Sequence, residues 1–121
     1  MSQTGSMLRY IADIGGVMPP KEDALANLRC DMIFNCAEEM GSINPIVNMY
    51  RDEVFAEKKA EYVGGAAKQI ACIQKRLEES SGPFFFGVTP YYCDFAWYHI
   101  WSNILLVEPS LLDGIPSIVG L

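Results

Sequence analysis

Apolar residues recur along most of the chain at intervals of three and four, which is the spacing of one face of a helix. Clusters of glycine and proline separate these stretches. The first stretch runs over residues 7–14 and stops at Gly15 and Gly16, which two prolines follow. Its apolar positions are Met7, Tyr10, Ile11 and Ile14.

A second helix is expected after the prolines. Glu22 and Asp23 stand in its first turn, where the helix dipole favours acidic side chains. Gly41 and the bend at residues 42–45 end it, and Pro45 is suited to restart a helix as its first residue. The expected buried face is Leu25, Leu28, Met32, Cys36 and Met40.

The clearest helical pattern covers residues 56–79. Gly64 and Gly65 lie inside it. They either weaken the helix by up to about 1 kcal/mol each or permit a close backbone contact. Its expected buried positions are Val63, Ala66, Ile70, Ile73 and Leu77.

The last third of the chain predicts a short extended link at 84–88, an apolar helix over 91–106 and the start of another helix after it. The apolar stretch carries Asp94, which costs roughly 3 kcal/mol at the centre of a spanning helix. Its uninterrupted part is shorter than the roughly 20 residues that a bilayer requires. A buried core helix is therefore favoured over membrane insertion, and with no repeat or sheet pattern the sequence predicts an all-α fold.

Composition narrows the class of protein. The chain has 121 residues, 50% of them hydrophobic and 20% charged, which suits one domain with a real core. A net charge of −6 without a basic run argues against nucleic acid as a partner. Four cysteines without a CxxC motif and one histidine do not make a zinc site. A disulfide framework stays open, but reduced thiols in the cytoplasm or another reducing compartment are favoured, since no secretory signal precedes the first helix.

Four segments in order resemble the glutathione transferases, nearest the sigma class that includes glutathione-dependent prostaglandin D synthases. "QTGSMLRYIA" is similar to the signature at the last helix of the family's thioredoxin-like domain. "DMIFN" resembles the first long helix of its helical domain, and "GPFFFG" with "CDFAW" resembles the entry to its buried helix. "LLVEPSLLDGIP" is similar to the stretch that follows that helix.

The resemblance implies that residues 1–16 are the last helix of an otherwise missing thioredoxin-like domain. Residues 17–121 then form a C-terminal-like helical domain, so the family's fold is truncated at both ends. The family conjugates glutathione to hydrophobic electrophiles with a tyrosine that lies in the missing domain. Tyr10 stands at a core position of the family signature, so no catalytic residue is expected here and the isolated chain is expected to be inactive.

Contacts to glutathione, the family's co-substrate, carry over in part. Gln3 and Thr4 match a pair that holds the γ-glutamyl carboxylate at a helix N-terminus, although Thr4 as a plain helix cap fits equally well. Glu39 matches an acid that reaches the neighbouring subunit's glutathione in a dimer. Glu38 and Asn35 match its companions in a cluster that can hold a cation; Asn35 replaces an acid there, so no metal is expected. Adjacent glutamates also suit a solvated helix face.

The resemblance also implies a pocket for the hydrophobic substrate, although the same apolar residues suit a core. Asp94 matches a residue that caps the buried helix, with Tyr91 in place of the usual Ser or Thr, which shifts the helix start. His99 is expected to be a packed histidine. The pocket positions are Met40, Gly41, Ile46, Trp101 and Ile104.

Two hypotheses follow. In the first, the chain is part of a glutathione transferase and lacks the catalytic domain. In the second, the helical domain is a non-catalytic structural or assembly subunit of a larger complex. Both predict that the chain occurs as a homodimer or within an assembly, with the apolar helix at residues 7–14 in the contact.

Overall fold

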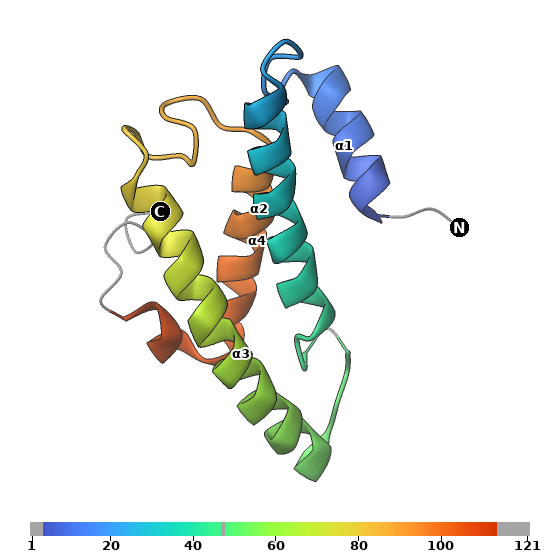
Figure 1. The fold of residues 1–121 in the computed structure, drawn as a ribbon. Helices are drawn as coiled ribbons and strands as arrows, with labels where there is room; N and C mark the ends of the chain where they lie inside the picture. Colours follow the sequence, from blue (N-terminus) through green and yellow to red (C-terminus); the bar gives the residue numbers. More distant parts are fainter. Residues whose placement is uncertain (1–3, 47, 114–121) are drawn as a thin grey trace.

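The computed structural model describes residues 4–46 and 48–113, and within them the fold consists of helices (Figure 1). These residues contain no strand, and Phe84 and Gly87 form an isolated β-bridge. The predicted all-α fold is confirmed. The elements are α1 (Thr4–Gly15), α2 (Ala24–Ser42), α3 (Asp52–Glu78), α4 (Tyr92–Val107) and the 3-10 helix η1 (Pro109–Leu112).

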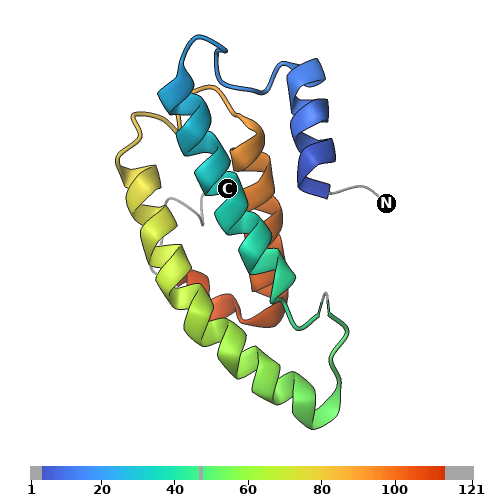
Figure 2. The same ribbon diagram turned by 45° about the vertical axis from the view of Figure 1, so that its right-hand side comes forward.

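The three long helices α2, α3 and α4 lie side by side, and α1 stands apart from α3 on the other side of α2 (Figures 1 and 2). α2 and α3 run in opposite directions. The most extensive packing joins α2 to α4, and η1 folds back against α3 and α4. The core of the molecule therefore lies where α4 meets α2 and α3.

Aromatic side chains of α4 fix it against α2. The indole N–H of Trp97 donates to the backbone carbonyl of Ile33 at 2.8 Å, and Trp97 is fully buried. The rings of Phe34 and Tyr92 pack with centroids 5.1 Å apart. Because Trp97 satisfies its only donor inside the core, it contributes apolar area without leaving a buried polar group unpaired.

The expected buried face of α2 is mostly wrong. Leu25, Leu28 and Met32 are 53%, 57% and 56% exposed, and only Met40 of the expected set is fully buried. The helix carries two apolar stripes, and the second one faces α4 because it contains the ring of Phe34 and the carbonyl that Trp97 needs. The buried residues of α2 are Cys30, Ile33, Phe34, Ala37 and Met40.

α4 is a core helix along one side only. Phe95, Tyr98, Leu105 and Leu106 are exposed on its other side. Its apolar residues extend around the helix, but the described part of the chain covers only half of that surface. No helix in that part combines the length and the hydropathy needed to cross a membrane.

α3 begins at Asp52, seven residues after the predicted restart at Pro45. Turns form at residues 45–46 and 48–49, where the Asn48 side-chain amide donates to the carbonyls of Ser42 and Asn44 at 2.8 and 2.9 Å. These bonds compete with helix formation. Four of the five expected buried positions of α3 are buried, while Val63 is half-buried and its neighbour Tyr62 is buried in its place.

The segment expected as an extended link is a tight turn. Phe84 and Gly87 exchange two backbone hydrogen bonds of 3.0 and 3.3 Å, and Gly87 has a φ of 103°. Only glycine adopts that conformation readily. The turn places Phe85 in the core beside the start of α4.

Candidate functional site

Arg9 fastens α1 to α2. Its Nε lies 2.6 Å from the carboxylate Oδ1 of Asp31, and its Nη2 donates to the Asn35 side chain at 2.8 Å. The guanidinium carbon stands 4.9 Å from the centre of the Phe34 ring. The hydrogen bond to Asp31 raises the pKa of Arg9 above its ordinary value. Asn35, which the resemblance placed in a cation-binding cluster, is thus engaged in holding α1.

Tyr92 joins α4 to the same carboxylate. Its hydroxyl donates to Asp31 at 3.0 Å, and its backbone N–H donates to the carbonyl of Val17 at 2.9 Å. Burial raises the pKa of Tyr92 well above its ordinary value, and nearby Cys30 and Asp31 add to the effect. The α1, α2 and α4 helices therefore meet at Asp31.

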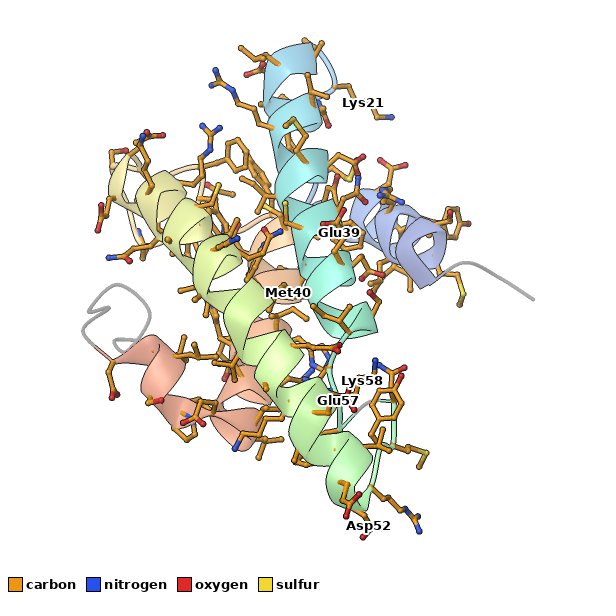
Figure 3. The ribbon with its side chains drawn as sticks, turned by 60° about the horizontal axis from the view of Figure 1, so that its bottom comes forward. Lys21, Glu39, Met40, Asp52, Glu57 and Lys58 are labelled. Atoms are coloured by element: carbon orange, nitrogen blue, oxygen red, sulfur yellow. The ribbon has the colours of Figure 1, made fainter. Side chains whose placement is uncertain are left out.

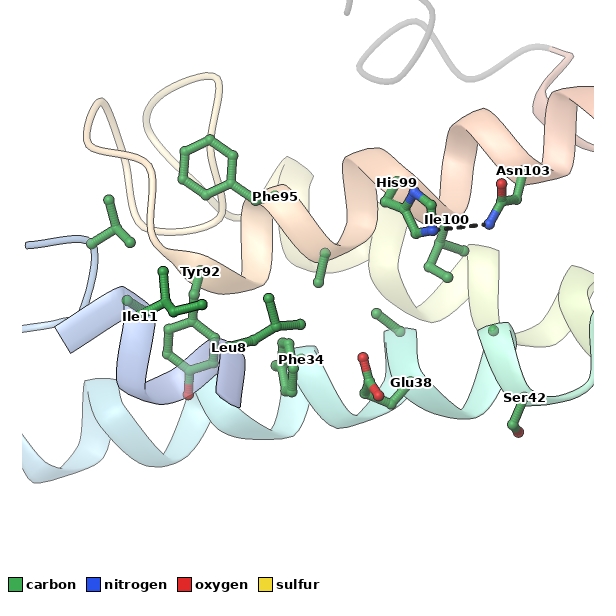
Figure 4. A pocket seen from close by; sticks show the side chains of 15 residues that line it. Leu8, Ile11, Phe34, Glu38, Ser42, Tyr92, Phe95, His99, Ile100 and Asn103 are labelled. Carbon is green, nitrogen blue, oxygen red and sulfur yellow. Dashed lines mark hydrogen bonds between the residues drawn. The ribbon is translucent and has the colours of Figure 1, made fainter. Parts of the chain in front are cut away.

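Beside this junction, a cavity of about 640 Å³ opens between α1, α2 and α4 (Figure 4). Its walls are mainly apolar, and aromatic rings and branched side chains of α1, α2 and α4 contribute to them. A volume of this size is in the range of small-molecule sites. The apolar walls include Leu8, Ile11, Phe34, Tyr92, Phe95 and Ile100.

The polar groups of the cavity gather toward one end. His99 and Asn103 lie one turn apart on α4, with Nε2 and Nδ2 3.3 Å apart, and Glu38 and Ser42 line the cavity from α2 (Figure 4). His99 is exposed, so the expectation of a packed histidine is wrong. The arrangement suits an amphipathic molecule whose apolar part lies against the rings and whose polar part meets these side chains.

The five residues expected to form a hydrophobic-substrate pocket are not together at this cavity. Gly41 lines it. Met40 and Ile104 are fully buried in the core, Trp101 lines a smaller cavity of about 250 Å³, and Ile46 is exposed. Residues of α1 and Phe95 of α4 line the cavity instead. A sequence pattern does not show that α1 packs beside α2 and α4, so it does not reveal these residues as part of one site.

The residues expected to contact glutathione are placed as follows. Gln3 lies outside the described residues, and Thr4 is the first residue of α1. Glu39 is exposed on α2, next to the buried Met40 that points between α2 and α3 (Figure 3). It is Glu38, one residue earlier, that lines the cavity.

Asp94 holds the entry to α4. Its Oδ2 accepts the backbone N–H of Tyr91 at 2.9 Å, and its Oδ1 accepts the N–H of Phe85 at 2.9 Å. Asp94 is 8% exposed, and burial raises the pKa of its carboxyl above the ordinary value despite these hydrogen bonds. Asp94 therefore ties the preceding turn to the first turn of α4.

The described residues form neither a metal site nor a disulfide. Among the described side chains, no three His, Cys, Asp or Glu residues lie together as a metal site. All four cysteines are free thiols. Cys30 and Cys93 are fully buried, whereas Cys36 is half-buried and Cys72 is exposed.

Comparison with known proteins agrees with the resemblance at a coarse level. No family model matches the chain. It is 25% identical over 118 residues to glutathione S-transferase B of Cavia porcellus and 26% identical over 118 residues to glutathione S-transferase Mu 2 of Mus musculus. The chain is similar to glutathione S-transferases. The similarity covers 98% of this chain but 52% and 51% of those proteins, so the chain spans about half the length of the curated relatives it matches.

Proposed function

We propose that this chain is the helical part of a glutathione-transferase-like protein and that the cavity between α1, α2 and α4 binds a hydrophobic electrophile or its conjugate. Conjugation itself depends on a part of the protein that supplies an activated thiol site. The observation that carries the proposal is the cavity of about 640 Å³, with apolar walls and polar side chains at one end.

The tyrosine beside the cavity is not suited to activate glutathione, so in this proposal another part of the protein supplies the activating group. Activating glutathione requires a donor that stabilises the thiolate and lowers its pKa. Tyr92 is the tyrosine that lines the cavity, and its hydroxyl already donates to Asp31. Because the pKa of Tyr92 is raised, its hydroxyl is a weaker acid than an ordinary tyrosine and is poorly suited to stabilise a thiolate.

The polar end of the cavity offers binding groups without reactive ones. Glu38 can attract an ammonium group, and His99 and Asn103 can exchange hydrogen bonds with a polar ligand group. Gln3, Thr4 and Glu39 stay proposed contacts to the γ-glutamyl end of glutathione. A reducing compartment such as the cytoplasm, which the four free thiols suit, is part of this proposal.

The test is direct binding of a conjugate at the cavity. A dinitrophenyl thioether, the product of joining a thiol to a chlorodinitrobenzene, is titrated into the protein and followed by quenching of tryptophan fluorescence. Ala96→Phe fills the cavity from α4, and Ala71→Phe adds the same ring to an exposed position of α3. We expect the Ala96 variant to weaken binding at least tenfold and the Ala71 variant to leave it unchanged.

A second filling variant protects the test against a folding failure. Leu8→Trp narrows the cavity from α1, and Leu8 is already 40% exposed, so the larger side chain has room to settle. Melting curves of all variants are compared first. Unchanged affinity in both folded cavity variants would overturn the proposed site.

A second candidate function rests on a different observation. Tyr10 and Ile14 on α1 are 68% and 70% exposed, and such apolar faces mark surfaces that another protein part covers. The chain could then serve as a structural subunit of a larger assembly without catalysis. Absence of both conjugate binding and stimulated conjugation, together with stable association through α1, would favour this second function.

A further inference from the structure

Two of the four cysteines, one on α2 and one on α3, line the same groove between these helices. Cys36 and Cys72 line the same cavity of about 260 Å³, together with Arg29, Met32 and Arg76. Burial raises the pKa of Cys36, and the negative charges of Glu39 and, to a smaller extent, Cys72 raise it further.

The register of the two helices supports this placement. Ile43 follows α2 directly, and its Cδ1 would lie 4.0 Å from a Cβ at Gly65 of α3. Cys36 precedes Ile43 by the same number of residues as Cys72 follows Gly65. That interval is close to two helical turns, or about 10 Å. α2 and α3 are antiparallel (Figure 1), so the interval from Ile43 back to Cys36 and the interval from Gly65 on to Cys72 run in the same direction in space. Each interval returns to the same face of its helix.

We propose that Cys36 and Cys72 form a reversible disulfide that joins α2 to α3 when the protein meets a low-molecular-weight disulfide such as oxidised glutathione. This modification site is independent of the proposed electrophile cavity, which lies on the other side of α2. The other two cysteines do not compete for the reagent, because both are fully buried.

The reaction balances in two exchange steps. The thiolate of the exposed Cys72 attacks one sulfur of oxidised glutathione, forms a mixed disulfide and releases one glutathione thiolate. The thiolate of Cys36 then attacks the Sγ of Cys72 and releases the second glutathione. Both cysteine protons leave to solvent, the protein loses two electrons and oxidised glutathione gains them. Arg29, Arg76 and Glu79 line the same cavity, so charges of both signs lie near the two sulfurs.

Closing the bond draws the helices together. A disulfide requires Cα atoms within about 7 Å, whereas packed helix axes usually stand 8–10 Å apart. The cavity between Cys36 and Cys72 gives the space for this approach, and it narrows when the bond forms. The disulfide would then fix the angle between α2 and α3. It would lie at the end of the groove that Arg76 lines.

The experiment incubates the native protein in buffers of increasing ratio of oxidised to reduced glutathione, then counts free thiols and measures intact mass under denaturing, non-reducing conditions. We expect the free-thiol count to fall from four to two, with a mass loss of two hydrogens and one cross-linked pair of peptides containing Cys36 and Cys72. Addition of dithiothreitol should restore all four thiols.

Matched variants separate the two steps. In Cys36→Ser the reaction should stop at a mixed disulfide on Cys72, seen as the added mass of one glutathione. In Cys72→Ser the native protein should keep its remaining thiols at the same glutathione ratios. Three results would overturn the proposal: a stable mixed disulfide in the unsubstituted protein, a cross-link that includes Cys30 or Cys93, or a disulfide between two chains.

Discussion

Arg9 and Asp31 join α1 to α2, with 2.6 Å between the guanidinium Nε and the carboxylate Oδ1. The same carboxylate oxygen accepts the Tyr92 hydroxyl at 3.0 Å, so one residue of α2 holds both α1 and α4. The side chains of the ion pair are 33% and 40% exposed, and solvent therefore screens their attraction. What makes Asp31 important is that it serves two partners at once.

Asp31→Ala should loosen α1 without unfolding the core. Loss of the screened ion pair and of the Tyr92 hydrogen bond together should cost about 1–2 kcal/mol in the free energy of unfolding. Hydrogen exchange of α1 amides should accelerate more than that of α2 amides. Lys58→Ala is the control, because Lys58 pairs with Glu61 on the exposed face of one helix and should cost less than about 0.5 kcal/mol. Equal effects of the two substitutions in urea denaturation would contradict the role of Asp31.

The two tryptophans of α4 offer a second comparison. Trp97 donates its indole N–H to Ile33, whereas the buried indole N–H of Trp101 has no hydrogen-bond partner within residues 4–46 and 48–113. Replacing each with Phe removes a similar volume, but Trp97→Phe loses the indole hydrogen bond to the Ile33 carbonyl, whereas Trp101→Phe removes a donor that makes no hydrogen bond. Trp97→Phe should therefore destabilise the fold by about 1 kcal/mol more than Trp101→Phe. Urea denaturation of both variants measures the difference, and the reverse order would refute it.

Asp94 should matter for folding and not for ligand binding. Asp94→Ala leaves the backbone N–H groups of Phe85 and Tyr91 without their acceptor, which should cost about 1–3 kcal/mol. The melting temperature should fall by several degrees, while any glutathione affinity of the folded protein stays the same. An unaltered melting curve would reject the capping role.

The raised pKa of Asp94 also predicts a pH dependence of stability. Burial is the largest cause and makes the folded protein bind the proton more tightly than the unfolded chain does. Between the ordinary pKa of 3.8 and the higher folded value, the folded state holds more protons, so this group's contribution to stability falls as the pH rises. Asp94→Asn should remove this part of the pH dependence between about pH 4 and neutrality. Parallel denaturation curves over that range, with the same slope in both proteins, would show that Asp94 does not titrate in this way.

The sequence predicted the helices well because their periodicity and their glycine and proline boundaries are local properties. It failed for the orientation of α2, where Leu28 and Phe34 lie on two stripes of similar hydropathy. Periodicity identifies such stripes, but only packing against Trp97 decides which of them is buried. The start of α3 was missed for a related reason. The side-chain amide of Asn48 donates to the carbonyls of Ser42 and Asn44, and helix propensity does not take such side-chain bonds into account.

The candidate site was less accessible to sequence reasoning. Gly41 lines the cavity from the last turn of α2, and its role in a substrate pocket stays a prediction. Leu8 and Phe95 reach the same cavity from distant parts of the chain, and that meeting depends on the docking of α1 through Arg9. Sequence reasoning expected Glu39 to reach the glutathione of a neighbouring subunit and named Glu38 only as its companion. A rotation of about 100° along the helix separates the two residues, and Glu38 lines the cavity.

Glutathione should bind the isolated chain weakly. The contacts proposed for Gln3, Thr4 and, from a neighbouring copy, Glu39 involve only the γ-glutamyl end and leave the cysteine and glycine parts unheld. A few exposed hydrogen bonds at about 1 kcal/mol each do not offset the cost of association. Calorimetry should therefore give a Kd in the millimolar range or weaker, and conjugation to an aryl halide should be undetectable. Micromolar affinity would show that the chain holds more of the glutathione site than proposed.

The exposed face of α1 makes a final prediction about association. Ala12 is the buried apolar residue of this helix, whereas Tyr10 and Ile14 are 68% and 70% exposed. Because these two residues and part of the apolar surface of α4 lie uncovered, the free chain gains by burying them, at roughly 25 cal/mol per Å² of apolar area. We expect a dimer or larger species at tens of micromolar, with α1 in the contact.

Light scattering of the pure chain and of two variants tests that contact. Tyr10→Glu combined with Ile14→Glu places charges on the exposed face of α1, where they oppose burial. Leu28→Glu makes the same change on the exposed stripe of α2, which is 57% exposed at that residue. If α1 carries the association, the double variant should shift the protein toward a monomer of 13.5 kDa and the α2 variant should not. A stable monomer of the unsubstituted chain at tens of micromolar would remove the argument, because an apolar face that stays in water without associating needs no partner.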